Sequence, residues 1–149
     1  MTGLSPRLRS IVEALPLRPG LRVVEIGCGP GAAAREVARR VGPDGHVLAV
    51  DRSARAIRQL ESSAADLIEA GLLRPCIAAI EDLALPPDEG RYDLAFAVRV
   101  GALDGRHPDA GRRALERIAA LLEPGGRLFI DGGDPLRELP LPGRPADRP

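Results

Sequence analysis

Apolar residues follow two patterns that alternate along the chain. Short, nearly continuous runs of Val, Leu, Ile and Ala predict buried strands at 21–26, 46–51, 76–80, 92–98 and 127–130. Between these runs, apolar residues recur at helical spacing and predict helices at 6–15, 31–41, 53–70 and 110–122. Strands alternating with helices indicate βαβ units and a mostly parallel sheet. The pattern predicts an α/β protein, a three-layer α/β/α sandwich.

The first predicted strand runs directly into a glycine-rich turn. Gly27, Gly29 and Gly31 occupy alternate positions, and an alanine run that favours a helix follows. Glycine reaches positive φ without strain and lets a ligand approach the backbone, and the free N–H groups of a helix start favour a polar or anionic group. Asp51 follows Gly31 by twenty residues, at the end of the second strand, where an acid can accept both hydroxyls of a ribose. Together they predict a nucleoside-type ligand.

One acidic residue interrupts the apolar run of the first strand. Glu25 lies two residues before Gly27, and a carboxylate buried without a partner is costly. A pyrophosphate would be repelled by this charge, whereas an ammonium group would be attracted. Glu25 therefore favours a nucleoside with a cationic end over a dinucleotide, and a nicotinamide-dependent oxidoreductase stays as an alternative.

Composition narrows the class of partner. Aromatic residues make up only 2% of the chain, and 21 basic residues balance 21 acidic ones, so neither nucleic acid nor an anionic membrane is predicted as a partner. No apolar stretch reaches the roughly 18 residues of a membrane span. With Cys28 and Cys76 as its two cysteines and no secretory signal, the sequence predicts a cytoplasmic protein. No cluster of residues has metal-ligand spacing, so no metal is expected.

Four segments, taken in order, carry the most specific signal in the sequence. Residues 24–31 read Val-Glu-Ile-Gly-Cys-Gly-Pro-Gly. Residues 46–53 contain the second predicted strand, which ends at the acid Asp51. Residues 92–97 form the fourth apolar run, and 122–128 contain a Pro-Gly-Gly turn into the fifth. Together they resemble the motifs of class I S-adenosylmethionine-dependent methyltransferases, which have a Rossmann-like fold. The resemblance covers roughly 20–130 and implies a methyltransferase that uses S-adenosyl-L-methionine.

The resemblance also implies which residues bind the cofactor. In this family the acid at the position of Glu25 faces the amino end of the methionine, the glycine turn wraps the middle of the cofactor, and the acid at Asp51 binds the ribose. Cys28 is interpreted as a small packing residue in that turn. The predicted cofactor-binding residues are Glu25, Gly27, Cys28, Gly29, Gly31, Asp51, Arg52, Ile80, Glu81, Asp82 and Ala97.

The adenine end of the site is less closely defined by the motifs. Family members often carry an acid just after the third strand, and that position falls on Ala79 here. Glu81 or Asp82 is expected to serve instead, with the backbone of Ile80 at the ring edge. The alternative is that Glu81 and Asp82 are only a solvated pair in a loop.

No catalytic residue is identified by the sequence. A sulfonium methyl group is already activated, so alignment and desolvation can supply most of the rate, and a base is needed only if the acceptor must lose a proton. His107, as a base, and Arg99, as an anchor for an acidic substrate, are the candidates. Residues 98–101 lack the Asn/Asp-Pro-Pro-aromatic motif of nucleic-acid amino methyltransferases, which favours a small-molecule acceptor.

The chain departs from the family pattern after the fifth strand. Family members usually add an antiparallel pair of strands, but residues 131–149 are rich in Pro, Gly and Arg and predict an irregular tail. We therefore expect a domain over 1–130 whose sheet has five strands in the order 3-2-1-4-5. The apolar edge at 128–130 would then need a cover, either the tail or a second subunit in a homodimer. The missing strands make a non-catalytic cofactor-binding subunit the alternative to an enzyme.

Overall fold

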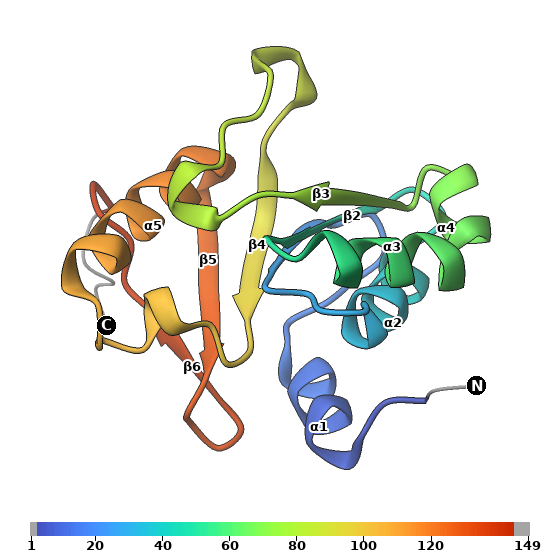
Figure 1. The fold of residues 1–149 in the computed structure, drawn as a ribbon, viewed down its shortest axis with the longest axis horizontal. Coiled ribbons are helices and arrows are strands. Elements are labelled where there is room, and N and C mark those ends of the chain that lie inside the picture. The colour runs from blue at the N-terminus through green and yellow to red at the C-terminus, as the bar shows by residue number, and fades with distance from the viewer. Residues whose placement is uncertain (1–2, 145–149) are drawn as a thin grey trace.

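The computed structural model describes residues 3–144 and is a three-layer α/β/α sandwich around one sheet (Figure 1). The sheet has six strands in the order β3-β2-β1-β4-β5-β6. The first five run parallel and β6 runs antiparallel to β5. The strands are β1 (Arg22–Ile26), β2 (His46–Asp51), β3 (Leu73–Ile77), β4 (Tyr92–Ala97), β5 (Leu122–Asp131) and β6 (Leu136–Leu139). The predicted fold class is confirmed.

Helices cover both faces of the sheet and divide the core into two layers. On one face α1 (Pro6–Ala14), α2 (Ala32–Val41), α3 (Ala54–Ser63) and α4 (Ala65–Glu69) pack on alternate strand residues such as Val23 and Phe96. On the other face α5 (Pro108–Leu121) packs on the residues between them, such as Val24 and Ala95. This alternation is the period of a strand buried on both faces.

The predicted third strand was placed too late in the chain. It was expected at 76–80, but β3 occupies Leu73–Ile77, and Ile80 begins a short 3-10 helix, η1 (Ile80–Asp82). Pro75 lies inside β3, which pairs only with β2. Because β3 is an edge strand, the missing proline N–H costs no ladder bond on its open side. The correction moves Ile80 from a strand into the turn that follows it.

The predicted helix over 53–70 is two helices. Ser53 caps α3 as expected, its Oγ accepting a hydrogen bond of 3.1 Å from the Ala56 N–H. The chain then leaves the helical conformation at Ala64 (φ −121°, ψ 24°), and α4 begins at the next residue. The buried Leu60 and Leu67 on either side of the break both pack in the same core layer.

The prediction of five strands and an irregular tail after residue 130 is wrong. Leu136–Leu139 forms β6, pairing along β5 from Leu128–Leu139 to Asp131–Leu136. Pro135 and Pro140 flank this strand without entering it, so no proline interrupts the ladder. The β5 edge is therefore covered by the chain itself, and the reason for expecting a second subunit there is removed. Residues 145–149 of the predicted tail lie outside the described residues.

Removing β6 tests its contribution to the fold. A chain ending at residue 134 would lose β6 and the buried Leu141, and would expose the β5 ladder. We expect Tm to fall by roughly 5 °C or more and the protein to self-associate, because open apolar strand edges pair with other chains. Thermal unfolding by circular dichroism and light scattering measure both effects, with the full chain as control. An unchanged Tm with a monodisperse sample would show that β6 is dispensable.

Candidate functional site

The predicted glycine turn has the backbone conformation that its glycines allow. Gly27, Gly29 and Gly31 have φ values of 70°, 55° and 90°. The N–H groups of Gly27 and Cys28 donate to the Val50 carbonyl at 2.8 and 3.0 Å, which ties the turn to the end of β2. A Cβ on Gly31 would clash with Leu60 of α3. The turn is therefore held between β2 and α3 and opens α2.

Asp51 joins the glycine turn to the start of α3. Its Oδ2 accepts a hydrogen bond of 2.9 Å from the Gly29 N–H, and its Oδ1 accepts one of 2.8 Å from the Ser53 N–H. A carboxylate has about four lone-pair sites, so each oxygen keeps one for a further donor. This arrangement fits a pair of ribose hydroxyls and fixes the carboxylate before any ligand arrives.

Glu25 is a residue of β1 whose buried side chain reaches the start of α2. Its residue is only 3% exposed, and its Oε1 has no hydrogen-bond partner among the described residues. Burial raises the pKa of this carboxyl to about 8, against the lowering effect of a hydrogen bond from the Ala34 backbone, and the charge of Asp51 raises it further. The unpartnered oxygen fits a cationic ligand group, which would restore the carboxylate form.

A cavity of about 580 Å³ lies beside these residues, at the carboxyl ends of β1 and β2. This is where open α/β sheets bind ligands, and the volume suits a small molecule. Of the predicted residues, the walls include Gly27, Asp51, Arg52, Ile80, Glu81, Arg99 and His107. The structure thus brings the ribose candidate Asp51, two of the adenine candidates, Ile80 and Glu81, and both catalytic candidates to one cavity.

Six predicted residues are not on the wall of this cavity: Glu25, Cys28, Gly29, Gly31, Asp82 and Ala97. The Asp82 carboxylate faces α5, 3.8 Å from the Arg113 guanidinium, so Glu81 is the acid of that pair that lines the cavity. Burial raises the pKa of the Cys28 thiol, so it stays protonated and packs as a small side chain. Ala97 is buried at the end of β4 and lines a second cavity of about 510 Å³.

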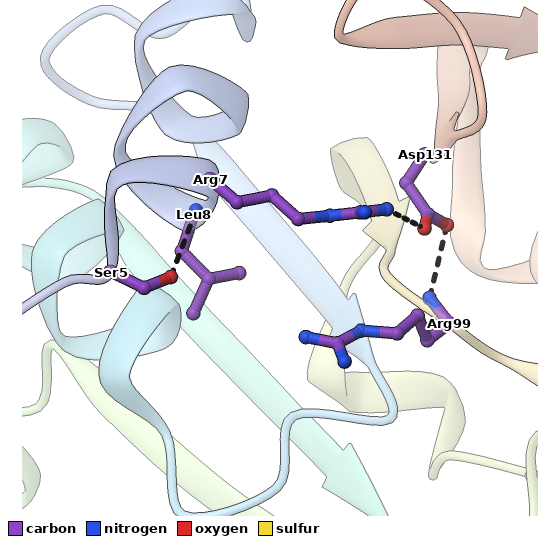
Figure 2. A network of polar contacts seen from close by, with 5 residues as sticks. All are labelled: Ser5, Arg7, Leu8, Arg99 and Asp131. Atoms are coloured by element: carbon purple, nitrogen blue, oxygen red, sulfur yellow. Dashed lines mark hydrogen bonds and ion pairs between the residues drawn. The ribbon is translucent and has the colours of Figure 1, made fainter.

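Arg99 is held in an unusual conformation between two strand ends. Its φ is 56°, the only positive φ of a non-glycine among the described residues. Its N–H donates to Asp131 Oδ1 at 3.0 Å, and the Arg7 guanidinium pairs with Asp131 Oδ2 at 2.7 Å (Figure 2). Ser5 Oγ caps the helix that carries Arg7 by accepting the Leu8 N–H at 3.2 Å. Asp131 therefore connects α1 to the loop after β4.

Sequence reasoning missed two residues on the cavity walls, Val100 and Arg137. Val100 lines both cavities, and its Cγ2 lies 2.7 Å from where a Cβ of Gly27 would be. Arg106 lines both cavities and bonds Asp104 at 2.6 Å, while Arg137 reaches the second cavity from β6. Arg137 was overlooked because its segment was interpreted as irregular. The proline-free interval between Pro135 and Pro140 was the available signal.

Neither a metal-binding cluster nor a membrane-spanning helix is present in the described part of the chain. Between residues 3 and 144, no three His, Cys, Asp or Glu side chains are grouped to hold a metal ion. Within the same residues, no helix combines the length and apolar character needed to cross a membrane.

The raised pKa of Glu25 predicts a pH dependence of stability. Between the ordinary carboxyl pKa of 4.5 and about 8, the folded state keeps a proton that the unfolded state releases. The free energy of unfolding should therefore fall as pH rises from 5 to 8, by at most about 1.4 kcal/mol per pH unit from this group. Denaturant titrations should show that Glu25→Gln removes this slope. The exposed Glu61→Gln is the control, and parallel curves for all three proteins would contradict the assignment.

Comparison with known proteins gives the family. A family model described as a methyltransferase domain matches residues 23–126. The chain is 34% identical to a nocamycin O-methyltransferase of Saccharothrix syringae over 91% of this chain and 47% of that protein. It is 33% identical to a ubiquinone/menaquinone biosynthesis C-methyltransferase of Bordetella parapertussis, over 76% of this chain and 41% of that protein. The chain thus spans less than half the length of these two relatives.

Solved structures agree with this result. The CcbJ methyltransferase of Streptomyces caelestis superposes with a TM-score of 0.65 at 26% identity, over 85% of this chain and 52% of that one. A phosphoethanolamine N-methyltransferase of Haemonchus contortus, solved with phosphoethanolamine and S-adenosylhomocysteine, shares the fold with a TM-score of 0.69 at 20% identity, over 83% of this chain and 24% of that one. The chain belongs to the class I S-adenosylmethionine-dependent methyltransferases, whose cofactor is S-adenosylmethionine.

Proposed function

We propose that this chain transfers a methyl group from S-adenosylmethionine to a small-molecule acceptor, mainly by alignment and desolvation. The observation that carries the proposal is the unpartnered, buried Oε1 of Glu25. Glu25 lies two residues before Gly27 and feels the charge of Asp51, and Gly27 and Asp51 both line the first cavity. A cationic amino group at Glu25 and a ribose at Asp51 would satisfy both carboxylates at once. Ile80 and Glu81, which also line this cavity, are assigned to the adenine.

Methyl transfer from a sulfonium requires little chemistry from the protein itself. The bound cofactor supplies a methyl group already activated on a sulfonium, so the chain has to orient the acceptor and exclude water. Arg99, Val100 and Arg106 line both cavities and therefore lie between the cofactor side and the second cavity, where we place the acceptor. His107, on the wall of the first cavity, is the candidate to take a proton if the acceptor must lose one.

A non-catalytic cofactor-binding subunit is the second candidate. It is favoured by one observation, that the ring of His107, the candidate base, makes no hydrogen bond with any residue from 3 to 144 that would orient it. Turnover of a metabolite panel by this chain alone would support the enzyme, whereas cofactor binding without turnover would support the subunit. A cytoplasmic location and a homodimer remain predictions from the sequence. The homodimer was predicted to cover the edge of β5, but β6 already pairs with that edge.

Cofactor binding tests the two carboxylates directly. We expect calorimetry to show S-adenosylhomocysteine binding to the wild-type chain, weakened about tenfold or more by Asp51→Ala and by Glu25→Gln, because each removes a charge-assisted bond worth about 1.5–3 kcal/mol. Glu61→Ala, exposed on α3, should bind like the wild type. Tight NAD binding with no binding of S-adenosylhomocysteine would refute the proposal.

A further inference from the structure

Two arginine side chains reach the second cavity without a counter-ion. This cavity lies at the carboxyl ends of β4 and β5, and its charged lining residues are Arg99, Asp104, Arg106, Asp131 and Arg137. It adjoins the cofactor cavity, because Arg99, Val100 and Arg106 line both. The charge on its walls therefore bears on the molecule that would meet the methyl group.

Both acids of this cavity are already engaged. The Asp104 carboxylate accepts hydrogen bonds from the Arg106 Nε at 2.6 Å and from the Arg106 N–H at 2.9 Å. Asp131 pairs with Arg7, which comes from α1 and is not part of the cavity wall, and it also accepts the Arg99 N–H. Neither acid is thus left to neutralise a further cation.

The guanidinium groups of Arg99 and Arg137 make no hydrogen bond or ion pair with any residue from 3 to 144. Figure 2 shows the Arg99 side chain extending away from Asp131, to which only its backbone is bonded. Arg137 lies opposite Ile130 on β6, and its Nε is 3.7 Å from the place of a Cβ on Gly132. Two arginine side chains without a counter-ion therefore line one cavity, Arg137 from β6 and Arg99 from the loop after β4.

The backbone at Arg99 supports a functional reading of this arrangement. A positive φ at a residue with a side chain is strained and persists only where the surroundings fix it. Here the fixing contact is Asp131, itself held by Arg7 at 2.7 Å. These contacts hold the Arg99 backbone at the boundary between the two cavities, with its guanidinium left unpaired.

We propose that the methyl acceptor carries a carboxylate or another oxyanion, which binds between Arg99 and Arg137 in the second cavity. A guanidinium presents a planar pair of N–H donors that matches an oxyanion, and two of them without counter-ions favour a negative ligand. The inference rests on the proposed function, since the second cavity is an acceptor site only if the first holds the cofactor.

Benzoate and its neutral counterpart benzamide are the probes. In the presence of saturating S-adenosylhomocysteine, ligand-detected NMR titration should show benzoate binding at least fivefold more tightly than benzamide, with the preference reduced by added salt. Arg99→Gln and Arg137→Gln should each remove most of that preference, and Arg137→Lys should keep part of it. Arg58→Gln, exposed on α3, is the matched control. Equal binding of the two probes, no benzoate binding, or benzoate binding insensitive to Arg137→Gln overturns the proposal.

A second titration separates the two sources of a carboxylate. S-adenosylhomocysteine carries its own carboxylate, so its affinity is compared with that of its decarboxylated analogue in the wild type and in Arg99→Gln. An equal effect of the substitution on both ligands supports an acceptor site. A loss confined to S-adenosylhomocysteine assigns Arg99 to the cofactor and overturns the paired site. Failure of the wild type to bind S-adenosylhomocysteine refutes the proposed function itself, whereas cofactor binding without benzoate binding refutes only this inference.

Discussion

The cofactor side of the site depends on one costly group, the buried carboxyl of Glu25. Burial raises its pKa to about 8, so the free protein holds it largely protonated near neutral pH. Its backbone partner, Ala34, lies in the first turn of α2, where an N–H has no intrahelical acceptor. The carboxyl therefore accepts an N–H at the start of α2, and its Oε1 is left without a partner among the described residues. The same residue serves the packing of the domain and the choice of ligand.

The turn that follows Glu25 is fixed by the neighbouring strand rather than by its glycines alone. Positive φ at Gly27, Gly29 and Gly31 permits the path of the chain, but the Val50 carbonyl and the Asp51 carboxylate accept the N–H groups that define it. Asp51 also begins α3 through the Ser53 N–H. Because β1 and β2 are parallel neighbours, their carboxyl ends meet and these bonds can form. The sheet order thus places Asp51 beside the glycine turn, at the proposed ribose position.

Most of the fold could be predicted from the sequence, and the residues proposed for the cofactor side could be named from it, because their signals are local. The period of apolar residues, the spaced glycines and the acids at Glu25 and Asp51 each lie within a short window. The errors occurred where a tertiary contact overrides the local pattern. Pro75 is tolerated in β3 because that strand is at an edge, and 136–139 becomes a strand because the open edge of β5 lies beside it. Local composition contains neither fact.

The proposed acceptor cavity differs because it is assembled from distant parts of the chain. Arg7 and Asp131 are 124 residues apart in the sequence, yet they form an ion pair, and Asp131 also accepts the backbone N–H of Arg99. Arg137 reaches the same cavity only because β6 pairs with β5. In Figure 1, α1 lies at the end of the sheet to which β4 and β5 point, which brings its arginine to Asp131. No short motif encodes such an arrangement, whereas one motif encodes the cofactor turn. Because the two sides share only the loop at Arg99, Val100 and Arg106, changes in α1 or β6 can alter acceptor binding while leaving the Glu25 and Asp51 contacts in place.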